Sequence, residues 1–333
     1  MPSPRDDILK LAAQDRRFMD RLDAQMTREI SKGYAAARRE LVGLITERRN
    51  ALYTGTFTGD KATRLRELAR DVGLLQQIEA RMKALSEQVA GTAQGAWRDA
   101  MAQGQGVSAE ELEILLHGLG DDLTLGLGAG SVEFSLQAID FLSVEIGLEE
   151  SLKALTQSQA QTAAVLRAEL RQGLLRGDSF DDLVRRLLAA NGSVFARGRL
   201  SAMLGARRNV IAANNGARQV VYDYWGNRIP GLSKQACAAI DENTTDCCLR
   251  VHGQVQPVSK PYILTGTPRF ADKMMYPGFH WNCRTSSVTY HAAFERGARV
   301  TTADMTGAAA AELKARRDGR EEIHPAHATS RRG

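Results

Sequence analysis

Apolar side chains that step by threes and fours through residues 65–89 constrain the fold of this chain more than any other feature. Positions three or four apart share one face of an α-helix, so this spacing lines one seam of a long helix. A similar pattern through residues 8–45 predicts an earlier long helix, broken near Gly33, and turn residues at 54–60 separate the two. We therefore predict an antiparallel helical hairpin over residues 1–100. The seam consists of Leu65, Leu68, Val72, Leu75, Ile78, Met82, Leu85 and Val89.

The hairpin allows two interpretations. It could be a coiled-coil arm that binds a neighbouring subunit, or an ordinary helical bundle that packs on itself. A seam of this length does not distinguish them.

Composition extends the helical prediction to most of the chain. The 333 residues exceed the usual size of one domain, so we expect several folded units. Hydrophobic residues make up 43%, as in soluble globular proteins, and Ala, Leu, Arg, Gln and Glu favour helix through the first two thirds. The predicted fold is mainly α, a helical hairpin or bundle, with a small, loop-rich C-terminal α+β module.

Changes in local amino-acid composition predict where the parts of the chain begin and end. Gly-rich sequence marks a connector with one short helix at 109–117, and leucine-rich faces predict helices at 151–175, at 179–190 with an end at Asn191-Gly192, and at 199–225. Short β-prone pieces occur at 253–258 and 285–290. The predicted parts are a hairpin at 1–100, a connector at 101–150, a helical middle region at 151–228, a Cys/His module at 229–298 and a flexible tail at 299–333.

Basic residues gather in one stretch although the net charge is only +5. Between Asp182 and Asp223 there is no acidic residue. This stretch could contact DNA, or it could be a solvated helix face whose acidic partners come from elsewhere in the fold. Its arginines are Arg185, Arg186, Arg197, Arg199, Arg207, Arg208 and Arg218, of which Arg197, Arg199, Arg207 and Arg208 are the candidate nucleic-acid contacts.

No segment has the length of uninterrupted apolar sequence that a membrane helix requires, and the N-terminus lacks the apolar core of a secretory signal. We therefore expect no membrane partner and a cytosolic, reducing environment. All four cysteines, Cys237, Cys247, Cys248 and Cys283, fall in one short window, which indicates a local site.

Two blocks in this window carry a family resemblance. The first is Asp241-Glu242-Asn243-Thr244-Thr245-Asp246-Cys247-Cys248 with His252-Gly253-Gln254-Val255, and the second is Pro277-Gly278-Phe279-His280-Trp281-Asn282-Cys283-Arg284-Thr285. An acidic residue before Thr-Thr, a Cys, a His-Gly and a distal His-x-Asn-Cys-Arg-Thr resemble the C-terminal module of the Mu F-like minor head proteins of tailed phages. Upstream, Gly177-Asp178-Ser179-Phe180 and the helix from Arg208 to Asn215 resemble the same family, although Asn209-Val210 stands where the family often has Thr-Glu.

The resemblance implies a minor capsid or head-morphogenesis protein with a structural role. Such a protein would lie inside the head of the virion near the portal vertex, after assembly in the host cytoplasm. Its implied partners are the portal protein, the major capsid or scaffold protein and packaged double-stranded DNA, with no small-molecule substrate.

The residues of the two blocks also predict a metal site. Cys248, His280 and Cys283 offer two thiolates and an imidazole for zinc, and Cys237, or alternatively His252, could supply the fourth ligand. An ion there would replace the hydrophobic core that so small a module lacks. Two other interpretations stay open: buried cysteines that act as small hydrophobes while His280 and Asn282 hydrogen-bond the loops, and a Cys248–Cys283 disulfide.

A metal-dependent nuclease acting on phage or host DNA is the alternative function. Such an enzyme needs an open metal position and a general base aimed at water. The spacing of Asp241, Glu242, Asp246 and His252 is not diagnostic of such a base. We therefore assign no catalytic residue.

Overall fold

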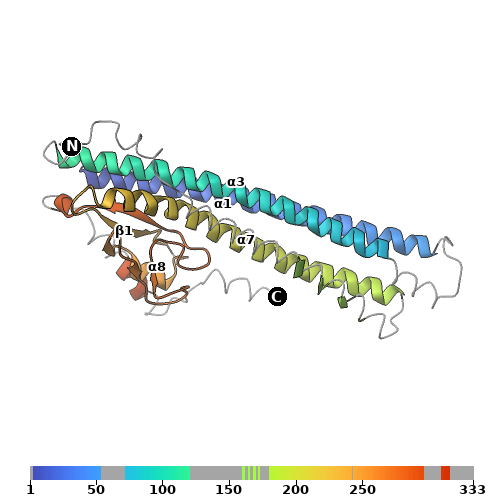
Figure 1. Ribbon diagram of the computed structural model, residues 1–333. Coiled ribbons are helices and arrows are strands. Elements are labelled where there is room, and N and C mark those ends of the chain that lie inside the picture. Colours follow the sequence, from blue (N-terminus) through green and yellow to red (C-terminus); the bar gives the residue numbers. More distant parts are fainter. Residues whose placement is uncertain are drawn as a thin grey trace. The chain divides into compact units, whose positions relative to one another are not determined.

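Three long helices dominate the computed structural model of the protein, which describes residues 3–53, 72–120, 180–241, 243–295 and 309–315 and a few positions between 160 and 172 (Figure 1). They are α1 (Pro4–Tyr53), α3 (Val72–Leu119) and α7 (Phe180–Gly226). The C-terminal module then contains β1 (Ser233–Ala238), α8 (Asp246–Val251), β2 (Val255–Pro257), β3 (Tyr262–Ile263), β4 (Lys273–Met274), β5 (Thr285–Tyr290) and the 3-10 turn η1 (Ala292–Glu295). The prediction of a mainly α protein with a small α+β module is confirmed.

The helices are longer than predicted. α1 continues through Gly33, α3 continues through the glycines after residue 101 to Leu119, and α7 continues through Asn191-Gly192. A glycine inside a helix costs about 1 kcal/mol relative to alanine, which the packing of a long helix outweighs. The predicted connector at 101–150 is therefore wrong as far as Leu119.

Several predicted segments lie outside the described residues. They are the loop at 54–60, the start of the second seam at 65–71, the connector beyond 120, most of the helix at 151–175 and most of the tail. Within the predicted flexible tail, residues 309–315 are helical, which corrects that prediction for this segment.

Contacts divide the chain into two compact units that differ from the predicted parts. Each long helix contributes residues to both units, because the divisions at 23/24, 95/96 and 206/207 fall inside the helices. The C-terminal module therefore shares a unit with helical segments from earlier in the chain. Unit 1 comprises residues 1–23, 96–148 and 207–333, and unit 2 comprises residues 24–95 and 149–206.

Unit 2 confirms the antiparallel pairing of α1 and α3. Glu40 of α1 pairs with Arg81 of α3 at 3.1 Å, and Gly33 of α1 faces Gln88 of α3. Residue numbers therefore rise along α1 where they fall along α3, so the two helices are antiparallel. The described part of the seam is buried: Ile78, Met82, Leu85 and Val89.

α7 packs on the same α1 segment. The rings of Tyr34 and Phe195 meet edge to face with centroids 6.0 Å apart, and the Ser31 hydroxyl lies 3.7 Å from the sulfur of Met203. Helices from three parts of the chain thus pack on one another in unit 2. This arrangement favours the bundle interpretation over a free coiled-coil arm.

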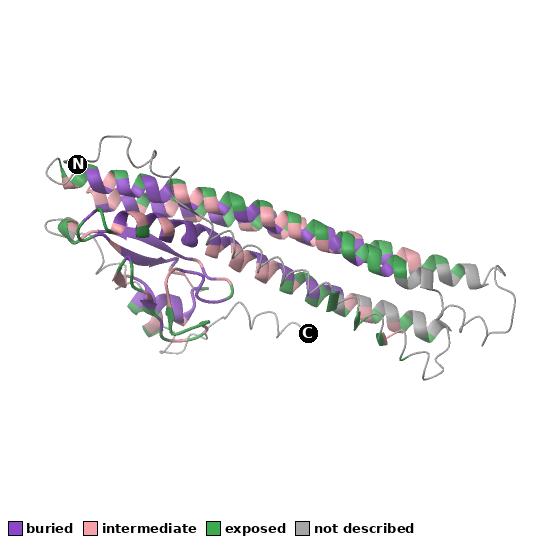
Figure 2. Ribbon diagram, in the orientation of Figure 1, coloured by how far each residue is buried: buried purple, intermediate pink, exposed green. Residues whose placement is uncertain are grey.

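The module of unit 1 is built on an antiparallel sheet with strand order β2-β1-β5. Successive side chains of β1 point to opposite faces, so Ala236 and Ala238 enter the core of the module while Cys237 packs with Ile8 and Ala12 of α1. Figure 2 shows β1 and β5 as almost entirely buried, whereas β2 is partly exposed. The sheet is covered on both faces, and the expectation that the module lacks a hydrophobic core is corrected.

Side chains from helices complete the hydrogen bonding of β5, an edge strand. Asn215 Oδ1 accepts from the Ser287 amide at 2.8 Å, and Arg218 donates to the Ser287 carbonyl at 3.0 Å. The amide of Thr289 donates to Glu111 at 2.9 Å. An unpaired backbone group buried away from water is costly, so these contacts fix the edge against α3 and α7.

A buried ion triad joins the same elements. The guanidinium of Arg218 pairs with Asp15 of α1 at 2.7 Å and with Glu111 of α3 at 2.9 Å, and none of the three side chains is exposed. Burial by itself would lower the pKa of Arg218, but the two carboxylates raise it well above its ordinary value. Tyr222 donates a further hydrogen bond to Glu111 at 2.9 Å. Arg218 therefore stays charged, and its two ion pairs hold α1, α3 and α7 together within unit 1.

The substitution Gly104→Ala should destabilise the protein by about 1–3 kcal/mol in chemical denaturation, because a Cβ at this position would lie 2.3 Å from the Asn214 carbonyl oxygen. The matched control is Gly106→Ala on the same helix, where nothing lies within 4 Å. This control should gain up to about 1 kcal/mol from helix propensity. Equal effects of the two substitutions would contradict the close approach of α3 to α7.

Candidate metal centre

Cys248, His280 and Cys283 come together in unit 1 and are called the triad from here on. Their ligand atoms all lie within 4.8 Å of one another, and all three side chains are buried. The two sulfur atoms are 3.9 Å apart, and His280 Nε2 lies 2.9 Å from the sulfur of Cys248. Two thiolates at about 2.3 Å from a tetrahedral zinc ion would be about 3.8 Å apart, so the sulfur pair already has the required spacing. The group could hold a metal ion.

Local backbone geometry aims these side chains at one point. Thr245 caps the N-terminus of α8 by accepting from the amide of Cys248, which fixes that thiol one turn into the helix. On the other side the Cys283 amide donates to the His280 carbonyl at 3.3 Å and closes a turn. Asn282 occupies the left-handed region of this turn with a φ of 59°, a conformation that asparagine adopts more readily than most residues.

Hydrogen bonds set the orientation and charge of the ligands. His280 Nδ1 contacts the Trp281 carbonyl, which leaves Nε2 facing the thiols. Burial would raise the pKa of the Cys283 thiol, but hydrogen bonds from Cys248 and His280 hold it well below its ordinary value. The pKa of His280 is raised by the same contact, against the effect of burial. The two shifts are opposite in direction, so each of these groups favours the charged form of the other. A bound metal would displace protons from the ligand atoms.

Neighbouring side chains outside the predicted set of metal ligands complete the site. The hydroxyl of Thr285 donates to the sulfur of Cys248 at 3.1 Å, and Thr245 Oγ1 lies 2.8 Å from His280 Nε2. Arg284 pairs with Asp241 and so ties the two sequence blocks together. Asp241 and Thr245 belong to the first sequence block, and Arg284 and Thr285 to the second. The acidic residue and the Thr-Thr pair of the first block were the sequence features that could have indicated these contacts.

A small polar cavity adjoins the triad on one side. Its volume is about 10 Å³, close to the space that one water molecule needs. Cys248 and His280 line it together with Thr245, Asn243 and Arg284. The triad with this cavity therefore offers three protein ligands and room for one further small ligand.

Neither predicted fourth ligand joins the triad. Cys237 points to the opposite face of β1, where its sulfur accepts from Arg16 at 3.6 Å. His252 Nδ1 accepts from the Ala238 amide at 2.9 Å and extends the hydrogen bonding of the sheet. The prediction that Cys237 or His252 is the fourth ligand is therefore wrong. Cys237 packs against α1 because alternate residues of β1 face opposite sides of the sheet, and His252 is turned away because its ring accepts from the backbone of Ala238.

The remaining cysteine interpretations can also be compared with the structure. All four cysteines are free thiols, so the proposed Cys248–Cys283 disulfide is absent. Cys247 is buried in the core of the module, and burial raises its pKa to about 12. It lies outside the Cys248, His280 and Cys283 group.

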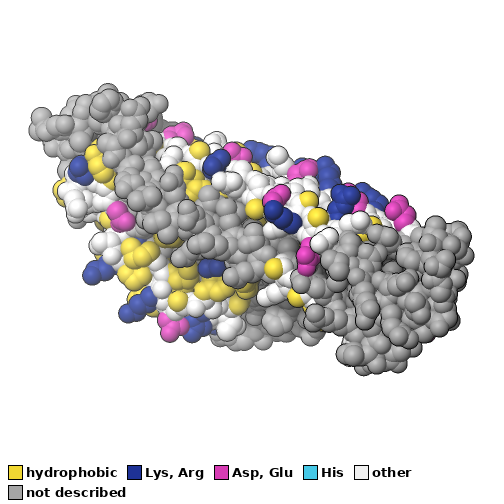
Figure 3. Space-filling model, turned by 45° about the vertical axis from the view of Figure 1, so that its right-hand side comes forward, with side chains coloured by type: hydrophobic (Ala, Val, Ile, Leu, Met, Phe, Trp, Pro, Cys, Tyr) yellow, Lys and Arg dark blue, Asp and Glu magenta, His cyan; other side chains and the backbone are white. Residues whose placement is uncertain are grey.

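The candidate nucleic-acid arginines have different environments. Arg207 pairs with Asp23 at 2.7 Å, and Arg208 stacks over the ring of Phe270 at 4.5 Å. Arg197 and Arg199 are exposed. The acidic partner of Arg207 is Asp23, and those of Arg218 are Asp15 and Glu111, so these partners come from elsewhere in the fold. Figure 3 shows one face of the molecule, on which the coloured Lys and Arg side chains are interspersed with Asp and Glu.

Comparisons of the chain with known protein families, with curated proteins and with solved structures found no match. Within the described part of the chain, no helix has both the length and the apolar character needed to cross a membrane.

Folding stability should fall between pH 6.5 and pH 4 because of His252. Burial, with a smaller contribution from the charge of Arg16, lowers the pKa of His252 to about 4. The unfolded chain takes up the proton below about pH 6.5, whereas the folded chain does so only near pH 4. The stability contributed by neutral His252 is therefore complete above pH 6.5 and is lost as the pH falls.

Denaturant unfolding of metal-free protein at pH 7 and pH 5 would measure this loss. Wild-type protein should lose about 1–2 kcal/mol more than His252→Asn between the two values. His291→Asn is the matched control, because that histidine is not buried, and it should behave as wild type. An identical pH dependence in His252→Asn and wild type would contradict the assignment.

Proposed function

We propose that this protein is a minor capsid or head-morphogenesis protein of a tailed phage, of the Mu F-like type, and that a structural zinc ion closes its C-terminal module. The observation that carries the proposal is the convergence of Cys248, His280 and Cys283. These residues come from the two sequence blocks on which the family resemblance rests. Their meeting in a buried site gives a physical reason for the shared residues.

The chemistry of the donor set supports zinc over harder cations. Thiolate and imidazole ligands suit zinc, whereas magnesium and calcium prefer oxygen ligands. A bound zinc ion would supply a link between the first turn of α8 and the turn that precedes β5. Thr285 would orient the Cys248 thiolate by its hydrogen bond, and the Trp281 carbonyl would orient the His280 ring.

A structural role in a phage head agrees with the rest of the described chain. The long α1, α3 and α7 helices offer extended surfaces for the portal, major capsid or scaffold protein. The exposed Arg197 and Arg199 could contact packaged DNA, while Arg207 and Arg218 have acidic partners within the protein. The protein would then act inside the virion near the portal vertex.

Purified protein should contain about one zinc ion per chain, and Cys248→Ser should lose it. Elemental analysis after dialysis measures the metal content. At a free zinc concentration a thousandfold above the dissociation constant, the unfolding free energy should be about 4 kcal/mol higher than that of the zinc-free protein. The matched control, Cys247→Ser, changes the neighbouring thiol and should keep the zinc. Zinc-free wild-type protein, or equal zinc in Cys248→Ser, would rule out the site.

Co-purification of the full chain with the portal, scaffold and major capsid proteins of the same phage tests the role in the head. We expect a stable complex with at least one of them, unaffected by His280→Ala if the helical surfaces make the contact. A different result would support the nuclease alternative: no head-protein complex, together with metal-dependent plasmid cleavage that His280→Ala abolishes.

A further inference from the structure

The proposed zinc ion has three ligands in the triad, one fewer than tetrahedral coordination requires. Among the described residues, no other histidine, cysteine, aspartate or glutamate joins the group. Zinc sites with four protein ligands are closed, whereas sites with three keep a position for water or a substrate. The fourth ligand therefore decides whether the ion is enclosed by the protein or can exchange a ligand with solvent.

The small polar cavity beside the triad has the size and polarity for a fourth ligand from solvent. Cys248 and His280 line it, and its volume of about 10 Å³ is close to what one water molecule needs. A buried water also needs several polar partners, and Thr245, Asn243 and Arg284 line the same cavity. The cavity thus suits a single water molecule or an equally small ligand, in contact with two members of the triad.

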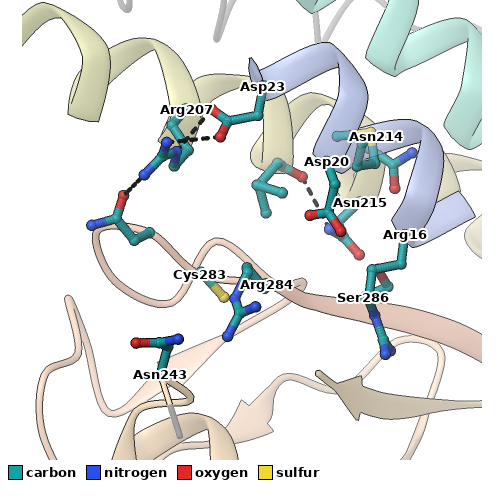
Figure 4. Close-up of a pocket in the computed structure, with 13 residues that line it drawn as sticks. Arg16, Asp20, Asp23, Arg207, Asn214, Asn215, Asn243, Cys283, Arg284 and Ser286 are labelled. Atoms are coloured by element: carbon teal, nitrogen blue, oxygen red, sulfur yellow. Dashed lines mark hydrogen bonds and ion pairs between the residues drawn. The ribbon is translucent and has the colours of Figure 1, made fainter. Parts of the chain in front are cut away.

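A larger cleft in unit 1 gives this cavity a route to solvent. The cleft has a volume of about 430 Å³ and shares Asn243, Asn282 and Arg284 with the cavity. None of these three residues is buried. Cys283, the third member of the triad, lines the cleft itself, and Figure 4 shows it there beside Arg284. A small ligand in the cleft is therefore separated from the cavity by exposed or half-exposed side chains, which can move aside.

We propose that the zinc ion of the triad keeps an exchangeable fourth position, which holds water in the small cavity and accepts small monodentate anions from the cleft. This position rests on the proposed metal centre and adds the class of ligand that the centre binds. Thr245 is its positioning residue, because Thr245 Oγ1 lies 2.8 Å from His280 Nε2, the nitrogen that would bind the metal. The Thr245 hydroxyl loses this partner when zinc binds, and it can then donate its proton to the fourth ligand.

Cobalt(II) in place of zinc makes the fourth position visible, because the d–d absorption bands of cobalt depend on its ligands. We would load the metal-free full chain with cobalt(II) and titrate it with sodium azide at constant ionic strength. Azide should shift the d–d bands saturably, with a dissociation constant on the order of millimolar, while the thiolate-to-cobalt charge-transfer bands persist. Perchlorate, an anion that coordinates metals poorly, should leave the spectrum unchanged.

Two substitutions of Thr245 test its positioning role. Thr245→Val keeps the volume of the side chain but removes the hydroxyl, so it should weaken azide binding about tenfold. Thr245→Ser keeps the hydroxyl and should bind azide as wild type does. Both variants retain the three metal ligands, so both should keep the charge-transfer bands of the cobalt protein. Thermal unfolding checks that each variant is folded, and the wild-type titration carries the test if Thr245→Val is not.

Wild-type cobalt protein whose d–d bands do not respond to azide would overturn the proposal, because the chain itself would then supply the fourth ligand. Loss of the charge-transfer bands during the titration would overturn it too, because azide would then have displaced a thiolate. Equal azide binding by Thr245→Val and wild type would overturn the role of Thr245. The metal centre stands in each of these cases, whereas a chain that binds neither cobalt nor zinc would overturn the proposed metal centre as well.

Discussion

The edge of β5 depends on helix side chains for its hydrogen bonds, and the rest of unit 1 depends on that contact. Asn215, Arg218 and Glu111 satisfy backbone groups of Ser287 and Thr289 that would otherwise be buried without partners. The guanidinium of Arg218 is itself held by Asp15 and Glu111, so the charge, the strand edge and three helices are linked. Breaking a buried pair by removing one partner typically costs about 3–5 kcal/mol, which makes this junction sensitive to single substitutions.

The candidate metal centre is connected to this junction through the chain. Cys283 lies two residues before β5, and Thr285, the first residue of the strand, donates to the sulfur of Cys248. Asn215 also donates to the Thr285 carbonyl at 3.4 Å. The helices therefore hold the end of β5 that positions Cys283. A metal ion at the triad would add to a framework that burial already stabilises, and it would not replace a missing core.

The same contacts explain why the sequence of the arginine-rich run of α7 allowed two interpretations, a DNA contact and a helix face with distant acidic partners. No acidic residue occurs between Asp182 and Asp223, so every local view of this run is strongly basic. The neutralising carboxylates of Arg207 and Arg218 come from α1 and α3, far away in the chain.

Periodicity and local chemistry determined much of this protein from the sequence alone. The buried seam at Ile78, Met82, Leu85 and Val89, the strand at residues 285–290 and the grouping of Cys248, His280 and Cys283 follow from spacing, which acts over a few residues. Only the tertiary structure decided the continuity of helices through Gly33 and Gly192, and the strand at 233–238, which has no β-branched residue. It also turned Cys237 away from the triad. These outcomes depend on packing and pairing between distant segments, which supply free energies that local preference does not contain.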